Sequence, residues 1–265
     1  MTVASECDVL VMGGGLAGLT LALQLRKQDA GLRIVVLERR RHPVPIAAHK
    51  VGESSVEIGA NYFDTVLGLQ QHLSQHQLKK FGFRFFFSEG CERIEDALEL
   101  GASRYLSTPG YQFDRGIFEN ALGEIARERG IEFVDGAAVR DFSLSEDGSP
   151  HVVEFEHAGE HHKVTARWVV DAAGRVGLIK RQRELALPSP HDANAVWFRI
   201  GARIDVAEWS KDAAWQARCD PPDRWLSTIH LVGRGYWVWL IPLSSGSHSV
   251  GIVCDAKLHP LEGMN

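Results

Sequence analysis

Apolar and polar positions in the first forty residues predict three elements in a fixed order. Residues 8–12 are a short β-branched run that ends in three glycines. Residues 16–27 then carry apolar side chains at helical spacing, and residues 33–37 form a second apolar run. A strand, a glycine turn, a helix and a second strand make a βαβ unit, which predicts a parallel sheet with a right-handed crossover.

The pattern further along the chain predicts one more helix and a hairpin. Apolar positions over residues 118–129 have helical spacing and lead into a strand at 132–134. Residues 152–156 and 164–170 read as antiparallel strands with a turn at Gly159 between them. We therefore expect antiparallel pairing to follow the parallel part of the sheet.

A second, aromatic-rich module begins after residue 187, where Pro188 and Pro190 break the chain. Six of the seven Trp lie between Trp197 and Trp239. The pattern predicts an antiparallel meander with strands at 195–204, 225–232, 236–243 and 247–254.

These patterns predict an α/β fold with two parts. Residues 1–187 form a Rossmann-like domain built on a GxGxxG turn, with room for a substrate-side insertion near residues 76–104. Residues 188–265 form an antiparallel β module that would contact the substrate, and this module is predicted to be incomplete.

Composition and charge narrow the class of protein. With 29 Lys and Arg against 34 Asp and Glu, the formal net charge is −5, and 45% of residues are apolar, as in soluble globular proteins. No dense Lys/Arg block is present, so neither nucleic acid nor an anionic membrane is expected as a partner. The four scattered Cys and the lack of a signal-like start predict reduced thiols in the cytoplasm. The histidines at 157, 161 and 162 lie in a polar hairpin, and we predict no metal site.

The glycine turn carries the first candidate chemistry. Gly13, Gly15 and Gly18 form GxGxxG between a strand and a helix, where the helix N-terminus faces a bound diphosphate. Glu38 ends the next strand, where a carboxylate accepts hydrogen bonds from a ribose diol. The alternative is a structural glycine turn without a ligand.

The glycines alone do not separate NAD from FAD, and the motifs that follow decide between them. VGES at 51–54, FDRGIFENAL around Arg115, DAAGR at 171–175 and WVWLIP at 237–242 follow GGGLAG. Over about residues 8 to 255 the chain resembles the FAD-dependent monooxygenase superfamily and, within it, flavin-dependent halogenases of the tryptophan halogenase type. The resemblance implies FAD as the cofactor, bound by Gly13, Gly15, Gly18, Glu38, Arg39, Gly52, Glu53, Ser54, Arg115, Asp171 and Gly174.

Trp237 and Trp239 belong to the WxWxIP pattern, the most specific element of the resemblance. Two residues apart on a strand, they point to the same face and form an indole wall. In the family this wall is thought to keep the organic substrate away from the flavin. The alternative is an ordinary aromatic core pair.

Family members guide the electrophilic halogen with a lysine, and KKFGFRFFF places that lysine at Lys80. Strand alternation predicts Phe81, Phe83, Phe85 and Phe87 on one face, with Lys80, Gly82 and Arg84 on the other. Lys79 would then point away from Lys80. The alternatives are a solvated lysine pair at a strand start, and Lys50 as a competing halogen-directing lysine.

The resemblance implies an FAD-dependent oxidoreductase of secondary metabolism. Reduced FAD from a separate flavin reductase, oxygen and halide would yield hypohalous acid, which Lys80 directs to a small electron-rich aromatic of the phenol, pyrrole or indole type. The sequence leaves open whether that aromatic arrives free or tethered to a carrier protein, and whether the halide is chloride or bromide.

Two other functions stay open. One is an FAD-dependent aromatic hydroxylase, a monooxygenase that shares the same motifs. The other is a non-catalytic flavin-binding fragment, since the family's later Gly-Asp motif is missing: none of the 26 Gly is followed by Asp. The sequence therefore looks truncated at its C-terminal end.

Overall fold

The computed structural model describes residues 4–47, 50–88 and 90–260, and its contacts divide the chain into two compact units. Unit 1 holds the residues up to Pro45 and Gly116–Leu187, and unit 2 holds Ile46–Arg115 and the residues from Pro188 onward. One division thus falls at residue 187. Residues 46–115, a longer stretch than the predicted insertion, group with unit 2. The assignment of the units to cofactor and substrate stays a prediction.

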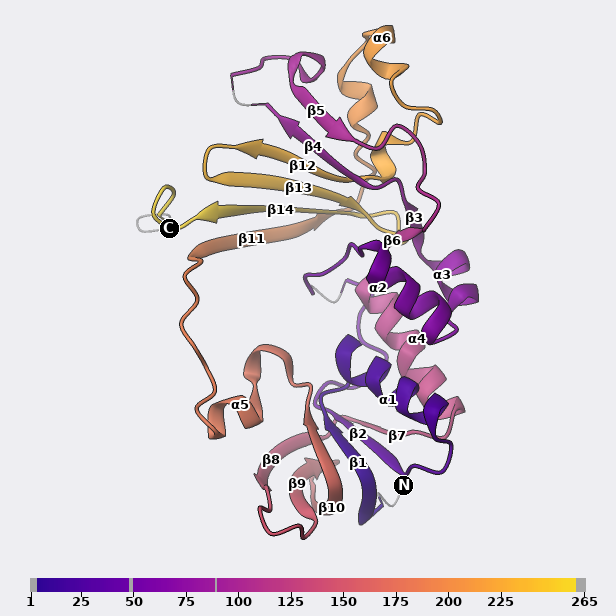
Figure 1. The fold of residues 1–265 in the computed structure, drawn as a ribbon, viewed down its shortest axis with the longest axis vertical. Helices are drawn as coiled ribbons and strands as arrows, with labels where there is room; N and C mark the ends of the chain where they lie inside the picture. Colours follow the sequence, from indigo (N-terminus) through magenta and orange to yellow (C-terminus); the bar gives the residue numbers. More distant parts are fainter. Residues whose placement is uncertain (1–3, 48–49, 89, 261–265) are drawn as a thin grey trace. The chain divides into compact units, whose positions relative to one another are not determined.

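The sheet of unit 1 has six strands in the order β7-β2-β1-β10-β9-β8 (Figure 1). Four strands run parallel: β7 (Glu132–Asp135), β2 (Ile34–Glu38), β1 (Glu6–Met12) and β10 (Glu160–Asp171). Two continue the sheet antiparallel: β9 (His151–His157) and β8 (Ala138–Ser143). The helices are α1 (Leu16–Gln28), α4 (Arg115–Glu128) and α5 (Leu178–Gln182). The predicted βαβ unit is confirmed. Strand β8 was not predicted, because half of its side chains are polar and each is at least partly exposed.

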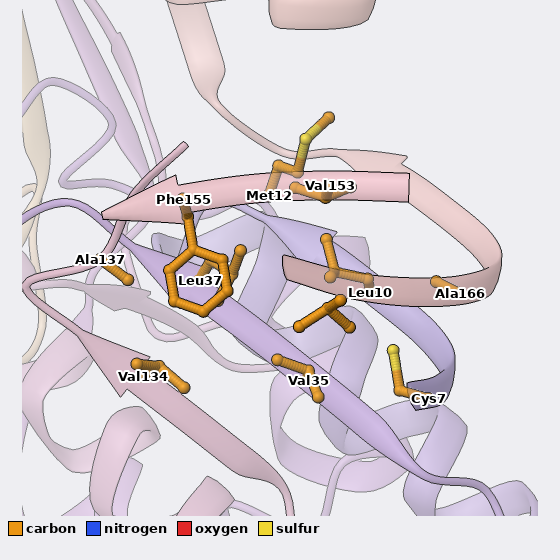
Figure 2. Close-up of a cluster of buried hydrophobic side chains, with 11 residues drawn as sticks. Cys7, Leu10, Met12, Val35, Leu37, Val134, Ala137, Val153, Phe155 and Ala166 are labelled. Carbon is orange, nitrogen blue, oxygen red and sulfur yellow. The ribbon is translucent and has the colours of Figure 1, made fainter. Parts of the chain in front are cut away.

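Both faces of β1 are buried, which fixes its central place in the sheet. Figure 2 shows Leu10 and Met12 in a cluster with Val35, Leu37 and Phe155 from neighbouring strands. Val9 and Val11 on the opposite face are buried as well, and α1 packs against β1 and β2. A parallel strand covered on both faces reads as a continuous apolar run, which is the pattern in residues 8–12.

The main sheet of unit 2 has the order β11-β14-β13-β12-β4-β5. The predicted meander is confirmed in β12 (Thr228–Gly233), β13 (Tyr236–Pro242) and β14 (His248–Asp255), with β11 (Ala193–Ile200) beside β14. β4 (Phe83–Phe87) pairs parallel with β12, and β5 (Leu98–Gly101) pairs antiparallel with β4. The smaller elements are β3 (Leu78–Lys80), β6 (Gly110–Gln112), α2 (Glu57–Asn61), α3 (Gln70–His76) and α6 (Ala213–Gln216).

The prediction of a single strand around Lys80 is wrong, because the chain bends at Gly82. Gly82 has a φ of +92°, so β3 ends at Lys80 and β4 begins at Phe83. The alternation of faces is lost across this bend. Lys80 and Phe83, predicted on opposite faces, are in contact: the lysine Nζ lies 3.2 Å from the centre of the phenylalanine ring.

Two buried arginines share one carboxylate in the interior of unit 2. Glu99 accepts a hydrogen bond from Nε of Arg224 at 2.9 Å and another from Nη1 of Arg84. The side chains of Arg84 and Arg224 are 2% and 1% exposed. Arg224 also lies over the Trp215 ring, 4.0 Å from its centre. The carboxylate therefore neutralises guanidinium charge that water does not reach.

Among the described residues, each helix is too short or too polar to cross a bilayer.

We expect Glu99→Gln to destabilise the protein by about 3–5 kcal/mol, because both guanidinium groups would stay buried without their counter-charge. Urea unfolding followed by tryptophan fluorescence measures the change. The matched control is Glu154→Gln, which breaks a 3.7 Å ion pair with Lys163 between side chains that are 52% and 62% exposed. The control should change stability by less than about 0.5 kcal/mol. Equal effects of the two substitutions would contradict this account of the buried triad.

Candidate functional site

The turn between β1 and α1 has no room for a side chain at Gly13, Gly14 or Gly18. Gly13 has a φ of +118°, and a Cβ on it would lie 2.3 Å from the carbonyl oxygen of Ala172. A Cβ on Gly18 would lie 1.9 Å from the carbonyl oxygen of Gly13. Gly15 differs, because a Cβ there would have no atom within 4 Å. The space beside Gly15 is therefore open to a ligand.

The N-terminus of α1 fits the diphosphate of FAD. Helix α1 has 13 residues and starts after Gly15, and no side chain caps it. The first amides of such a helix are hydrogen-bond donors that attract an anion. An open cradle at Gly15, next to an uncapped helix start, is the arrangement that a diphosphate needs.

Glu38 ends β2 beside the glycine turn. Its Oε2 accepts a hydrogen bond from the Gly14 amide at 2.8 Å, and its Oε1 accepts one from the Arg40 amide at 2.8 Å. Each carboxylate oxygen keeps a free lone-pair direction in this arrangement, so a ribose hydroxyl could still donate to it. The neighbouring Arg39 side chain is exposed.

Asp171 folds the DAAGR turn at the end of β10. Its Oδ1 accepts from the Ala173 amide at 3.1 Å, and its Oδ2 accepts from the Ile179 amide at 2.9 Å. Gly174 follows in the turn with a φ of +63° and is exposed. The carboxyl ends of β1, β2 and β10 therefore gather the predicted residues Gly13, Gly15, Glu38, Asp171 and Gly174, at the edge where open α/β sheets bind ligands.

The VGES loop in unit 2 is held by Arg115 and Thr228. Nη1 of Arg115 donates to the carbonyl oxygens of Val51 at 2.9 Å and Gly52 at 3.3 Å. The hydroxyls of Ser54 and Thr228 are 2.6 Å apart. The observed contacts of Arg115 thus shape the loop, and its contact with FAD stays a prediction, as do those of Gly52 and Ser54.

Glu53 is committed to a buried ion pair. Its side chain is 4% exposed, and Oε1 accepts from Nη2 of Arg199 at 2.8 Å. Arg199 also pairs with the fully buried Asp114 at 3.3 Å. Glu53 was predicted among the FAD ligands, whereas Arg199 and Asp114 were not predicted as site residues. In this arrangement the Glu53 carboxylate anchors the loop to β11.

A cavity of about 210 Å³ lies between this loop and one face of the main sheet of unit 2. Besides residues 51–54, it is lined by side chains from three adjacent strands: Phe83, Thr228, His230, Trp239 and Ile241. The walls are mainly apolar. Pockets for drug-sized ligands measure about 300–1,000 Å³, so this cavity suits a smaller molecule.

The two tryptophans of WxWxIP share a strand face but differ in environment. Trp239 lines the cavity and is 7% exposed, and its Nε1 donates to the Ser249 hydroxyl at 3.2 Å. Its indole lies against Gly251, where a Cβ would come within 2.3 Å of the ring. Trp237 is 36% exposed and lies outside the residues that line the cavity. Of the predicted pair, Trp239 is the one at the cavity wall.

Lys80 is buried, whereas Lys79 is exposed. The Lys80 side chain is 3% exposed, and Nζ donates to the Ser55 carbonyl oxygen at 2.9 Å. Burial lowers the pKa of Lys80 from 10.5 to about 8, and the nearby Glu57 carboxylate opposes that shift. Lys79 lies with Nζ 4.9 Å from the centre of the Tyr105 ring. The two lysines therefore differ in charge environment as well as in direction.

The competing lysine, Lys50, is only half-buried and belongs to the segment that leads into the VGES loop. The Phe83 ring links Lys80 to the cavity, because it contacts the ammonium group and also lines the cavity wall. The burial of Lys80 and its contact with Phe83 favour Lys80 over Lys50 as the candidate halogen-directing lysine.

His230 and Thr228 were not predicted as site residues. Both lie on β12 and face the cavity, and His230 is directly opposite Trp239 on β13. A signal for His230 was present in the sequence, because a hairpin folded at residues 234–235 places His230 opposite Trp239. Both strands were predicted from the sequence, but their register was not.

The chain matches the FAD binding domain family over residues 6–258. It is 27% identical to flavin-dependent halogenase chlA of Dictyostelium discoideum, over 94% of this chain and 45% of that protein. It is 25% identical to the 1H-pyrrole-2-carbonyl (peptidyl-carrier protein) brominase of Pseudoalteromonas luteoviolacea, over 97% of this chain and 57% of that protein. The crystal structure of CmlS, a flavin-dependent halogenase, aligns with a TM-score of 0.71 and 25% identity, over 96% of this chain and 42% of CmlS.

The chain spans about half the length of the relatives that it matches. The predicted fold class and the predicted resemblance to flavin-dependent halogenases are confirmed, and the prediction of FAD rather than NAD is confirmed by the family. Because the family match extends over nearly the whole sequence, the chain belongs to the FAD binding domain family.

Proposed function

We propose that this chain acts in flavin-dependent halogenation of a small electron-rich aromatic of the phenol, pyrrole or indole type. Lys80 directs hypohalous acid to the aromatic ring, and the wall at Trp239 keeps the ring out of the cavity. One observation carries the proposal: a buried lysine with a lowered pKa contacts Phe83, in the wall of a small apolar cavity that Trp239 also lines.

The cofactor would be held by the residues at the carboxyl ends of β1, β2 and β10. The diphosphate would lie at Gly15 and the start of α1, and a ribose hydroxyl would donate a hydrogen bond to the Glu38 carboxylate. When bound, reduced FAD would supply two electrons and two protons, with which oxygen, a halide ion and one further proton give hypohalous acid and water.

The environment of Lys80 suits two ways of guiding the halogen: a hydrogen bond from the ammonium group, and nucleophilic attack by the neutral amine. With a pKa of about 8, most of the side chain is an ammonium donor at pH 7, and roughly a tenth is a neutral amine. The ammonium can donate a hydrogen bond to hypohalous acid, and the amine can accept the halogen as a nucleophile. A fully solvated lysine would offer far less of the amine.

The size of the cavity supports the division of roles between Lys80 and Trp239. About 210 Å³ accommodates a halide or hypohalous acid easily, but it is small for a substituted aromatic attached to a carrier. The aromatic would therefore meet the halogen at the lysine rather than inside the cavity. Trp237, which is more exposed, would extend the same wall.

Two partners complete the proposal. A separate flavin reductase would supply the reduced cofactor. The aromatic would arrive free or on a carrier protein; a relative named for a carrier-bound pyrrole supports the second form.

Gly15→Ala should fold normally but weaken FAD binding by about tenfold or more, which is about 1.4 kcal/mol. A methyl group there enters the open space that the diphosphate would occupy, and it meets no protein atom within 4 Å. Quenching of flavin fluorescence on titration measures the affinity. Gly18→Ala is the matched control: its methyl group would collide with the Gly13 carbonyl, so it should lower the unfolding temperature as well. Unchanged FAD affinity in Gly15→Ala would contradict the proposal that the diphosphate binds at this turn.

Lys80→Met should abolish aromatic halogenation while hypohalous acid still forms. Methionine keeps the apolar contact with Phe83 but has no nitrogen. In the full-length enzyme, with reductase, halide and a responsive phenol, we expect product to fall at least about a hundredfold, or about 2.7 kcal/mol. A soluble trap for hypohalous acid should receive the halogen that no longer reaches the phenol.

The control is Lys79→Met, which should keep near-normal product formation because Lys79 is exposed. Loss of product in Lys79→Met with normal turnover in Lys80→Met would show that Lys79, and not Lys80, directs the halogen. Oxygenated product that forms without halide in the wild type would favour the aromatic hydroxylase instead.

The lowered pKa of Lys80 has a consequence that needs no cofactor. Between pH 8 and 10.5 the folded chain binds fewer protons at this residue than the unfolded chain, so the free energy of unfolding should rise with pH in that window. Below pH 8 the residue opposes folding to the full extent. Lys80→Met should lack this rise, and denaturation at a series of pH values would measure it. Parallel stability curves for wild type and Lys80→Met would refute the shift.

A further inference from the structure

His230 on β12 is a half-buried residue whose buried Nδ1 has unused hydrogen-bonding capacity at the cavity. Its ring stacks on Phe85, with 4.8 Å between ring centres and 14° between planes. Nδ1 is buried and has no hydrogen-bond partner among the described residues. A buried polar atom without a partner is unfavourable, and one that faces a cavity is a candidate to bind a molecule there.

The other polar side chains at the cavity are already paired. The Thr228 hydroxyl contacts the Ser54 hydroxyl at 2.6 Å and donates to Oε1 of Gln112 at 3.0 Å. Glu53 is held by Arg199. Among the described residues that line the cavity, His230 is therefore the one with a buried side-chain nitrogen or oxygen that has no hydrogen-bond partner.

The imidazole is neutral at physiological pH. Burial and the nearby Lys80 charge lower the pKa of His230 to about 4, against a weaker opposing effect of the Thr228 carbonyl. A neutral imidazole has one donor and one acceptor nitrogen, and it has no net charge with which to hold a halide ion. It suits a small neutral molecule that carries both a donor and an acceptor.

Resting on the proposed function, we propose that His230 is a positioning residue that holds hypohalous acid in the cavity by a hydrogen bond, before the halogen reaches Lys80. Hypohalous acid is neutral, has two heavy atoms and carries one hydroxyl group. Its hydroxyl would bond to the imidazole and leave the halogen directed along the apolar wall. Phe83 joins the two positions, since it lines the cavity, contacts Lys80 Nζ at 3.2 Å, and lies 5.9 Å from the His230 ring centre.

The test compares three substitutions in the full-length enzyme with FAD, reductase and bromide. His230→Phe keeps the ring and its stacking but removes both nitrogens. His230→Asn keeps a polar group at the position of Nδ1, and His230→Gln keeps one at the position of Nε2. Two products are measured for each oxygen consumed: brominated phenol, and hypobromous acid caught by a soluble trap.

We expect His230→Phe to lower the ratio of brominated phenol to trapped hypobromous acid by at least about fivefold, the scale of one neutral hydrogen bond. Oxygen consumption should stay near normal. One of the two amide variants should restore the ratio. His161→Phe is the control, because His161 is exposed on the hairpin of unit 1 and should leave the ratio unchanged.

An unchanged ratio in His230→Phe, or an equal loss in all three variants, would overturn the inference, because the side chain would then act by shape or not at all. A wild-type enzyme that brominates no aromatic would instead refute the proposed function, whatever the variants do. Nitrogen NMR of the flavin-free protein gives an independent readout: the His230 ring should stay neutral from pH 6 to 8, and a charged ring at pH 7 would also overturn the inference.

Discussion

Arg199 determines the shape of the candidate site in unit 2. From β11 it reaches Glu53 in the VGES loop and the fully buried Asp114, which immediately precedes α4. Two carboxylates and one guanidinium are thus enclosed together, and removing one partner of such a set leaves an uncompensated buried charge. Because the loop is held at Glu53, the adjoining Ser54 and Ser55 are held too. Ser54 contacts Thr228 in the wall of the cavity, and the Ser55 carbonyl oxygen accepts the hydrogen bond from Lys80.

The same arrangement accounts for the electrostatics around Lys80. The lysine donates to a backbone carbonyl rather than to a carboxylate, and Phe83 covers its ammonium group. A carbonyl and an aromatic face stabilise the cation less than a carboxylate would, so the amine form becomes accessible near neutral pH. The buried carboxylates of this region are committed elsewhere: Glu53 and Asp114 to Arg199, and Glu99 to two arginines. This separation of charges leaves the pKa of Lys80 lowered.

What the sequence predicted correctly depends on short-range patterns. The glycine turn, α1 and β2 follow from spacing within thirty residues. Gly18 is required by a contact inside the βαβ unit, with the Gly13 carbonyl, whereas Gly13 is required by its contact with the distant Ala172. The surroundings of Lys80 could not be found in the same way, because alternation fails at Gly82, whose positive φ is not visible in the pattern. Arg199 and His230 were missed for a different reason. The partners of Arg199 lie on distant segments, and an isolated arginine in a strand has no periodicity to reveal it. His230 could be found only from the register of the hairpin that pairs it with Trp239.

The parallel pairing of β4 with β12 bears on how the chain folds as it is made. Phe83 pairs with Thr228, so the phenylalanine-rich strand leaves the ribosome long before its neighbour in the sheet is synthesised. Until then only β5 can pair with it, and a two-stranded hairpin is marginally stable in water. FRFFF is meanwhile an apolar segment of high β-propensity with a free edge, which favours association with other chains. The buried Arg84 within it would serve as a gatekeeper in this interval, because its charge keeps the segment in water until Glu99 and the late strands enclose it.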